Sequence, residues 1–326
     1  MPARAARRRP RVAVIVPCYR ETNHIMDVLA GIGDIVDTVY VVDDACPDDT
    51  GGLVQRECKD QRVKILRHER NKGVGGATLT GYRQALADGI DIMVKLDGDG
   101  QMDPALIGGL IAPVVNGTAD YAKGNRFHGL RGISAMPWSR IFGNLVLSFA
   151  SKISSGYWNI LDPTNGFTAI HADALKELPL DDLSEGYFFE SDMLVHLGLA
   201  RAVVQDIPMV ARYGSEVSGI RIPSIVPEFV FKHVRATLRR LLITYFIRET
   251  NMATVQLLLG LMLVGFGVTF GAVKWINADT TGIPATAGTV VLAALPIILG
   301  SQALIAFISF DTRNEPTEPL QATHTD

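Results

Sequence analysis

The sequence predicts an α/β domain with a mostly parallel sheet, followed by two membrane-spanning helices that form a hairpin. Apolar, β-branched runs of strand length alternate with segments of helical spacing in the first part of the chain. This alternation is the pattern of a parallel sheet covered by helices. Two later runs, Met252–Val273 and Ala285–Phe310, contain no charged residue. Each is long enough to cross a hydrocarbon core, which needs about 20 residues.

Apolar runs that end in polar or turn residues justify the strands of this domain. The first is “RVAVIVPCYRE”, which precedes a segment of helical spacing. “TVYVVDDACPDDT”, “VKILRHE” and “DIMVKLDGDGQ” follow it, with a helix predicted over “GGATLTGYRQALADG”. In parallel sheets of this kind ligands bind beyond the carboxyl ends of the strands. The unusual residues of the chain lie at such ends, at positions 17–21, 43–44 and 97–101.

The composition narrows the range of partners and metals. The chain has 326 residues and a formal net charge of −3, which gives no general argument for nucleic acid as a partner. Cys18, Cys46 and Cys58 lack a metal-binding spacing and cannot all pair, so we expect reduced thiols in a cytosolic domain. The histidines contain no HxxxH-type pair, which disfavours a zinc site.

The segments between the domain and the spans are amphipathic. Residues 137–158 and 227–249 place apolar side chains at helical spacing, and both could simply cover the core. For the second we favour a helix in the membrane interface, because it is basic and runs into the first span. The predicted parts are a basic flexible tail (1–11), the α/β domain (12–222), an amphipathic juxtamembrane segment (223–250), the hairpin (251–310, with spans at 252–273 and 285–310) and a cytoplasmic tail (311–326).

Basic residues predict the orientation of the hairpin. Several precede the first span: Lys232, Arg235, Arg239, Arg240 and Arg248. The linker between the spans, “KWINADTTGIP”, contains one basic residue, Lys274. The positive-inside rule therefore places the α/β domain and the tail in the cytoplasm, and makes the chain an integral protein of the cytoplasmic (inner) membrane. The hairpin could also form a homo-oligomer through small residues of its first span: Gly260, Gly265, Gly267 and Gly271.

The turn “KLDGDGQMDP” carries the strongest chemical signal. Asp97 and Asp99 follow a buried strand, and Gln101 adds an amide oxygen. Carboxylates at strand ends are often solvated caps, but oxygen ligands in a fixed turn suit a hard divalent cation. Magnesium usually binds through one or two carboxylates together with substrate phosphates. The turn therefore predicts Mg²⁺ or Mn²⁺ and a diphosphate substrate, whose leaving group the metal would neutralise.

Together with the motifs around it, this turn resembles a known family. “VPCYRE”, “VVDDACPDDT”, “NKGVGGA”, “KLDGDGQMDP”, “KGNR” and “DPTNGF” occur in the order seen in family 2 glycosyltransferases of the GT-A fold. The stretch from Val12 to Arg221 is most similar to the branch that makes dolichyl- or polyprenyl-phosphate sugars, whose bacterial members also carry two C-terminal spans. The resemblance implies inverting, metal-dependent transfer of a single sugar from a UDP- or GDP-linked donor to a polyprenyl phosphate at the cytoplasmic membrane face.

The resemblance implies roles for donor-side residues. The nucleotide sugar would be bound by Pro17, Tyr19, Glu21, Asp43, Asp44, Lys72, Gly73 and Asp97. Asp44 would hydrogen-bond the base, and Asp43 would support that loop. Asp97 would contact the sugar or ribose and would join Asp99 and Gln101 in the metal site. The residues alone leave two alternatives open: an Asx-type turn for the adjacent aspartates, and a plain helix-entry loop for “NKGVGG”.

The resemblance also implies an acceptor side. Its residues would be Asn125, Arg126, Arg131, Asp162, Thr164, Asn165, Glu190 and Arg212, and the catalytic groups would be Asp97, Asp99, Asp192 and Arg126. Glu190 and Asp192 could instead be acids favoured by a helix start. A lipid phosphate is mostly a dianion at neutral pH, because its second pKa is about 6, and needs no general base. A hydroxyl acceptor would need one, and Glu190 or Asp192 would then be the candidate.

Two departures from the family pattern and three other hypotheses bear on the function. The chain has Thr168 and Glu216 where such enzymes often carry arginine and lysine. The positive charge that the arginine and lysine would supply could come instead from Arg126, Arg131, Arg212 or Arg221. A transferase acting on a hydroxyl of a glycolipid or lipid-linked sugar, and a catalytically silent membrane scaffold, are the other hypotheses retained. A nicotinamide dehydrogenase is disfavoured, because the first strand ends without a glycine-rich phosphate loop.

Overall fold

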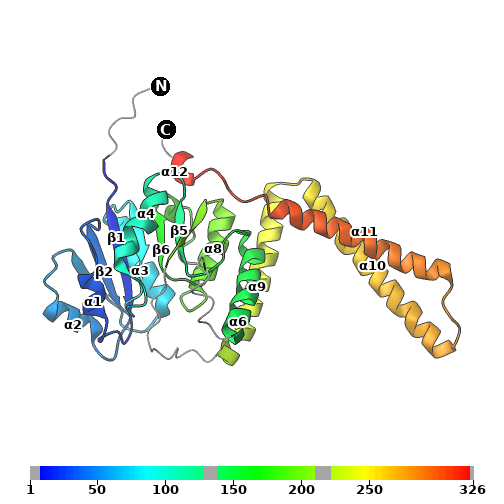
Figure 1. Cartoon of the computed structure of the whole chain (residues 1–326), viewed down its shortest axis with the longest axis horizontal. Helices are drawn as coiled ribbons and strands as arrows, with labels where there is room; N and C mark the ends of the chain where they lie inside the picture. The colour runs from blue at the N-terminus through cyan, green and yellow to red at the C-terminus, as the bar shows by residue number, and fades with distance from the viewer. Residues whose placement is uncertain (1–7, 128–137, 210–221, 324–326) are drawn as a thin grey trace, which may run out of the picture. The chain divides into compact units, whose positions relative to one another are not determined.

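The α/β domain is built on one mostly parallel sheet. The computed structural model describes residues 8–127, 138–209 and 222–323. Its strands are β1 (Val12–Cys18), β2 (Thr38–Asp43), β3 (Val63–Arg67), β4 (Ile92–Lys95), β5 (Tyr121–Asn125), β6 (Thr168–His171) and β7 (Val204–Pro208). In this part of the chain they form a seven-stranded sheet of order β3-β2-β1-β4-β6-β5-β7 (Figure 1). β6 is antiparallel to both neighbours and the other pairs are parallel, which confirms the predicted fold class.

Helices cover both faces of the sheet. The helices of the described residues, including those outside the α/β domain, are α1 (Ile25–Ala30), α2 (Thr50–Glu57), α3 (Gly73–Ala87), α4 (Ile107–Val115), α6 (Trp138–Ser155), α7 (Ala172–Lys176), α8 (Phe189–Ala200), α9 (Ile222–Leu242), α10 (Met252–Thr281), α11 (Ala287–Asp311) and α12 (Leu320–Thr323), with short helical turns at η1 (Pro104–Leu106) and η2 (Ile243–Arg248). Along β1, Ala13 and Ile15 join one apolar cluster, while Val14 and Val16 join the other. Successive side chains of a strand point to opposite faces, so both faces are buried, which explains the unbroken apolar runs.

The direction of β6 determines which residues meet at the edge of the sheet. The carboxyl ends of β1, β2 and β4 lie at one edge, because these strands are parallel. Since β6 runs the other way, its amino end lies at that edge, and Thr168 pairs with both Lys95 and Lys123. The turn before β6, residues 162–167, is thereby brought to the end of β4 and to the acidic turn that follows it.

The end of the chain belongs to the α/β domain. The structure divides into one unit of Met1–Thr237 with Pro316–Asp326 and a second unit of Leu238–Glu315. The buried carboxylate of Asp120 accepts hydrogen bonds from the backbone N–H groups of Leu320 (2.9 Å) and Gln321 (3.1 Å). The sequence predicts a separate tail over 311–326 and a domain that ends at 222. In the structure the hairpin lies between two segments of the chain that belong to the first unit, and the boundaries at 222 and 311 stay predictions.

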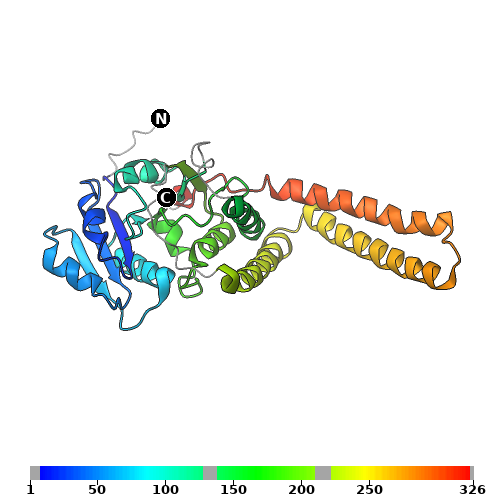
Figure 2. The ribbon, with the colours of Figure 1, turned by 60° about the horizontal axis from the view of Figure 1, so that its bottom comes forward.

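The second unit contains the two apolar helices. α10 and α11 lie side by side in both views (Figure 1, Figure 2). Both are long and apolar enough to cross a membrane, and most of their surface is exposed, so they fit the predicted transmembrane hairpin. The helix α10 continues through residues 274–281, beyond the predicted end of the first span. The helix ends at Gly282, which has φ +68°, and Pro284 follows two residues later.

Glycines of the hairpin mediate contact between its own two helices. A Cβ atom on Gly260 would lie 2.7 Å from Cδ2 of Leu304, and one on Gly267 would lie 2.7 Å from the carbonyl oxygen of Ala293. A Cβ atom on Gly265 would meet nothing within 4 Å. The structure therefore gives Gly260 and Gly267 a role in packing within the hairpin, whereas the sequence pattern alone suggests contacts between copies of the chain.

This packing gives a matched pair of substitutions. Gly267→Ala should destabilise the protein by about 1–3 kcal/mol, because the new methyl group overpacks a helix contact. Gly265→Ala, on the same helix, adds the same group to open space. Thermal unfolding of the full chain in detergent should show a lower midpoint for Gly267→Ala than for Gly265→Ala. Equal midpoints would contradict the packing described above.

Two helices of the first unit expose apolar residues and bury polar ones. On α6, Leu145 and Phe149 are exposed, whereas Ser151 and Ser154 are buried. On α9, Val230 and Phe231 are exposed, whereas His233 is buried and forms a 2.9 Å hydrogen bond with Ser154. These helices thus do not cover the core with their apolar faces, as their spacing alone would allow.

Candidate active site

Asp43 holds the loop that follows β2. Its carboxylate accepts hydrogen bonds from the backbone N–H groups of Cys46 and Gly51, each at 2.8 Å. The side chain is buried, so both of its oxygens are used to shape the loop. Asp43 therefore fixes this loop by accepting hydrogen bonds from two of its backbone N–H groups.

Asp44 joins the end of β2 to the loop before α3. Its Oδ1 accepts from the N–H of Lys72 (2.8 Å), and its Oδ2 accepts from the N–H of Gly73 (2.7 Å). Gly73 has φ +84°, a conformation that favours glycine. The structure thus brings together Asp44, Lys72 and Gly73 as the sequence suggests, through contacts that leave the Lys72 side chain exposed.

His68 is a neighbour of Asp44 that sequence reasoning missed. Its Nδ1 lies 2.6 Å from Asp44 Oδ1, and its Nε2 lies 2.8 Å from Thr80 Oγ1. The imidazole side chain is buried and connects the strand end to α3. The available signal was a histidine near the end of the predicted strand “VKILRHE”.

The loop after β1 lies beside the acidic turn. Pro17 is buried in the strand and Tyr19 is exposed. A Cβ atom on Gly98, the glycine between Asp97 and Asp99, would lie 3.4 Å from Cγ of Glu21. Glu21 and the “DGDG” turn therefore share one corner of the sheet edge.

The acidic turn presents oxygen ligands in a defined conformation. Asp99 Oδ1 accepts a hydrogen bond from the N–H of Gln101 (3.0 Å), across Gly100, which has φ +74°. The donor set of two carboxylates and an amide suits a hard cation such as Mg²⁺ or Mn²⁺. Among residues 8–127, 138–209 and 222–323, no group of three or more His, Cys, Asp and Glu side chains could hold a metal alone. The chemistry of the turn fits a cation whose remaining ligands come from substrate and water.

Asp97 is held by a buried lysine. Lys95 Nζ lies 2.5 Å from Asp97 Oδ1 and 3.2 Å from Glu190 Oε1. The Lys95 side chain is 1% exposed, and although burial opposes its charge, the two carboxylates raise the pKa of Lys95 above its ordinary value. A Cβ atom on Gly166 would lie 2.5 Å from both Lys95 Nζ and Asp97 Oδ2. The “NGF” turn thus lies directly on this ion pair, and a side chain at position 166 would displace Lys95 or Asp97.

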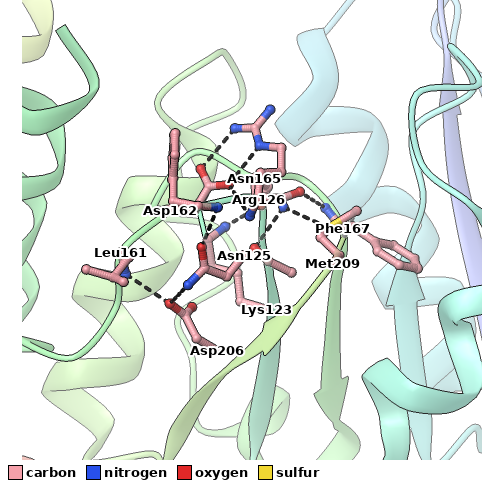
Figure 3. A network of polar contacts seen from close by, with 11 residues as sticks. Lys123, Asn125, Arg126, Leu161, Asp162, Asn165, Phe167, Asp206 and Met209 are labelled. Atoms are coloured by element: carbon pink, nitrogen blue, oxygen red, sulfur yellow. Dashed lines mark hydrogen bonds and ion pairs between the residues drawn. The ribbon is translucent and has the colours of Figure 1, made fainter. Parts of the chain in front are cut away.

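Several of the residues predicted for the acceptor side belong to one network of polar contacts (Figure 3). The Arg126 guanidinium donates from Nε to Asp162 Oδ2 (2.7 Å) and from Nη2 to Asp162 Oδ1 (2.9 Å). Asn125 Nδ2 donates to Asp206 Oδ2 (3.0 Å), and Asn165 Nδ2 donates to the carbonyl oxygen of Gly124 (2.7 Å). Three predicted residues, Asn125, Asp162 and Asn165, are thereby buried supports of the edge rather than exposed groups.

Two ionisable residues of this network were not predicted. Lys123 is fully buried and donates to the carbonyl oxygen of Asn165, and burial lowers its pKa to about 8. Burial also raises the pKa of Asp206 to about 6. Both residues interrupt short apolar strands, which is the one signal that the sequence offered. Thr164 is half-buried in the same turn.

Glu190 and Asp192 have different surroundings. Glu190 lies in the first turn of α8 and reaches Lys95. Asp192 Oδ2 accepts from the N–H of Ser184 (2.8 Å), and its Oδ1 lies 3.5 Å from His196 Nδ1. Although burial opposes the charge, His196 and the Ser184 N–H lower the pKa of Asp192 below its ordinary value. Glu190 therefore lies at the predicted site, where it pairs with Lys95. Asp192 instead holds the loop at Ser184. Arg131, Arg212, Glu216 and Arg221 lie outside the described residues.

Comparison with known proteins agrees with this geometry. The model of the family “Glycosyl transferase family 2” matches residues 13–179. A UDP-N-acetylglucosamine–dolichyl-phosphate N-acetylglucosaminyltransferase of Methanococcus voltae is 31% identical, over 62% of this chain and 86% of its own. An undecaprenyl-phosphate mannosyltransferase of Micrococcus luteus is 33% identical, over 61% of this chain and 82% of its own.

A solved structure shares the fold. It is glucosyl-3-phosphoglycerate synthase from Mycobacterium tuberculosis, in complex with Mn²⁺, uridine diphosphate and glucosyl-3-phosphoglycerate. The TM-score is 0.51 at 19% sequence identity, over 71% of this chain and 80% of that chain. With the family match, the sheet order and the acidic turn at the strand ends, the chain belongs to glycosyltransferase family 2 and has the GT-A fold.

Proposed function

We propose that this glycosyltransferase moves a single sugar, with inversion, from a UDP- or GDP-linked donor to a polyprenyl phosphate at the cytoplasmic face of the inner membrane. The observation that carries the proposal is the contact of two turns at one sheet edge. Gly166, in the acceptor-side turn, lies against Asp97, in the donor-side turn. A donor and an acceptor bound there would meet. The names of the two relatives, both of which act on a polyprenyl phosphate, support this acceptor.

The residues of the acidic turn would hold the metal. Asp99 and Gln101, with Asp97 beside them, offer oxygen ligands to Mg²⁺ or Mn²⁺. When bound, the cation supplies positive charge to the leaving nucleoside diphosphate. Asp44, fastened to the N–H groups of Lys72 and Gly73, shapes the loop over the nucleotide. Tyr19 and Glu21 lie at the corner where the base and ribose would bind.

The membrane-facing parts support a lipid acceptor. The exposed apolar residues of α6 and α9 suit the surface of a bilayer, as does the run of α9 through η2 into α10. Arg235 and Arg239 are exposed on α9 and would contact anionic lipid. Since the hairpin leaves and re-enters one domain, its two ends lie on the same side of the membrane. The basic residues before the first span favour the cytoplasmic side.

The acids of α8 favour phosphate over hydroxyl as the acceptor group. A general base for a hydroxyl works best with a pKa near the working pH. The pKa of Asp192 is lowered instead, and Glu190 is paired with a buried lysine. A phosphate dianion needs positioning and charge screening, not proton removal. A transferase acting on a glycolipid hydroxyl is therefore the second candidate.

Transfer assays with the full chain in detergent test the proposal. UDP- and GDP-sugars are supplied with Mn²⁺ and either undecaprenyl phosphate or undecaprenol. We expect metal-dependent transfer to the phosphate alone. Asp192→Asn should keep turnover within about fivefold, because its carboxylate holds a loop and takes no proton. Transfer to a lipid hydroxyl that Asp192→Asn abolishes would favour the second candidate. If the protein bound no nucleoside diphosphate in the presence of metal, the hypothesis of a catalytically silent membrane scaffold would be favoured.

A further inference from the structure

We infer that Lys95 is a positioning residue, which holds Asp97 and Glu190 on the two sides of the place where donor and acceptor meet. The inference rests on the proposed function, because it concerns the alignment of that reaction. Lys95 is the last residue of β4, and its side chain is 1% exposed. It lies too deep to touch a substrate, so its effect must pass through its two partners.

The ammonium group of Lys95 bridges distant parts of the chain. Asp97 follows β4 on the donor side, whereas Glu190 begins α8. The Nζ atom lies 2.5 Å from a carboxylate oxygen of Asp97 and 3.2 Å from one of Glu190. An ammonium carries three donors, so it can serve both carboxylates at once. One buried cation thus determines where both carboxylates point.

The sheet leaves Lys95 little freedom to adopt another position. Lys95 pairs with Thr168 of the antiparallel strand β6, so both side chains project from the same face. Gly166 then covers the ion pair, with room for no side chain. Lys123, on the neighbouring strand β5, is also opposite Thr168. Its ammonium group, however, donates to the carbonyl oxygen of Asn165. The two buried lysines therefore have different roles, since Lys123 supports a turn whereas Lys95 orients carboxylates.

Loss of Lys95 would leave the carboxylates of Asp97 and Glu190 without the buried cation that they share. A charge in a buried place without its partner is unfavourable. We expect Asp97 and Glu190 to turn apart, so that the bound donor is no longer aligned. Lys95 pairs with these two carboxylates, whereas the loop at Lys72 is held separately by Asp44. Nucleotide binding should therefore survive while turnover falls.

The test separates alignment from folding and from nucleotide binding. Four forms of the full chain are compared in detergent: wild type, Lys95→Met, Glu190→Gln and the double variant. Turnover is normalised to protein that binds Mn²⁺ with UDP or GDP in calorimetry, whichever the wild type binds. Lys95→Met should lower kcat about 100-fold, since small misplacements cost this much. Its donor KM and nucleotide Kd should rise by no more than about tenfold, because Asp97 moves while Asp99 and Gln101 remain to hold the metal.

The double variant provides the readout that a merely structural role would not change. Because Lys95 and Glu190 act as one unit, the double variant should turn over about as slowly as Lys95→Met alone. Lys64→Met is the control, because Lys64 is an exposed lysine of β3 that pairs with Asp88 (2.6 Å). It should keep wild-type kcat. A kcat for Lys95→Met within about threefold of wild type, or losses that simply multiply, would overturn the inference.

A second variant covers failure of Lys95→Met to fold. Gly166→Ala keeps every charge but places a methyl group 2.5 Å from Lys95 Nζ and from Asp97 Oδ2. It should also lower kcat about 100-fold while nucleotide still binds, and normal turnover would overturn the inference. If the wild type itself binds neither UDP nor GDP with Mn²⁺, the proposed function fails. That result is distinct from every result with a variant.

Discussion

Asp99→Asn is expected to abolish metal-dependent turnover, with a loss of about 10³-fold or more. The substitution removes a negative charge from the turn that would hold the cation, and it leaves the size of the side chain almost unchanged. The Asp99 carboxylate also accepts from the N–H of Gln101, a bond that the asparagine oxygen can still accept. The turn should therefore keep its shape while its affinity for Mg²⁺ or Mn²⁺ falls. Calorimetry with Mn²⁺ and UDP or GDP, beside transfer assays, measures both effects.

Asp103→Asn is the matched control for this prediction. Asp103 lies in the same motif, and its carboxylate accepts from the N–H of Ala105 at the start of η1 (3.1 Å). Asparagine caps helices as well as aspartate does, so this variant changes only a charge near the turn. It should keep metal-dependent turnover within about threefold of wild type. Equal losses in both variants would point to general electrostatics of the loop, and unchanged turnover in Asp99→Asn would exclude this metal site.

The framework of the site follows from local pattern. The runs that became β1, β2 and β4 are apolar without interruption, and that is what strands buried on both faces require. Parallel strands bring their carboxyl ends to one edge, so Pro17, Asp44 and Asp97 could be assigned to a common edge before any contact was known. The two membrane-spanning helices could also be predicted from the sequence. A helix of this length in a soluble core usually keeps a polar face, and these two runs have none.

The burial and the partners of the charged residues beneath the site could not be predicted from local sequence pattern. Lys95 looks like a solvated lysine at a strand end, and Lys123 looks like a lysine on the solvent side of a strand. The burial of both depends on partners that lie far away in the chain. The antiparallel direction of β6 decides those partners, and nothing in “FTAIH” marks direction. Glu190 and Asp192 stand two residues apart on a helix, so they face different sides, but only the packing of α8 shows which side is the site.

Helices α6 and α9, which expose apolar residues and bury polar ones, show a second limit of prediction from sequence. Their spacing predicts amphipathic helices correctly, but the same spacing fits a helix on a core and a helix on a bilayer. In the structure serines of α6 and His233 of α9 are buried while apolar residues of both helices are exposed, an orientation that the spacing alone does not determine. The return of the chain end to Asp120 is likewise a tertiary contact, made by backbone N–H groups that no sequence pattern identifies.

Arg126→Met is expected to impair both stability and transfer, and a second substitution should separate the two effects. The Asp162 side chain is 1% exposed and is held by two hydrogen bonds from the Arg126 guanidinium. Removing the arginine leaves a buried carboxylate without its cation, which should cost about 3 kcal/mol of unfolding free energy. Thermal unfolding of the full chain in detergent measures this loss. Transfer to undecaprenyl phosphate should fall about 100-fold, because a cation on the acceptor side is lost.

Adding Asp162→Asn to Arg126→Met removes the stranded charge, so most of the lost thermal stability should return. If Arg126 also screens the acceptor phosphate, transfer should stay low in this double variant although the protein is stable again. Arg83→Met is the control, since Arg83 pairs with Asp181 (2.7 Å), whose side chain is 96% exposed, and such pairs contribute little. Recovery of transfer together with stability would instead mean that Arg126 acts only as the partner of Asp162. The acceptor phosphate would then have to find its positive charge elsewhere on the chain.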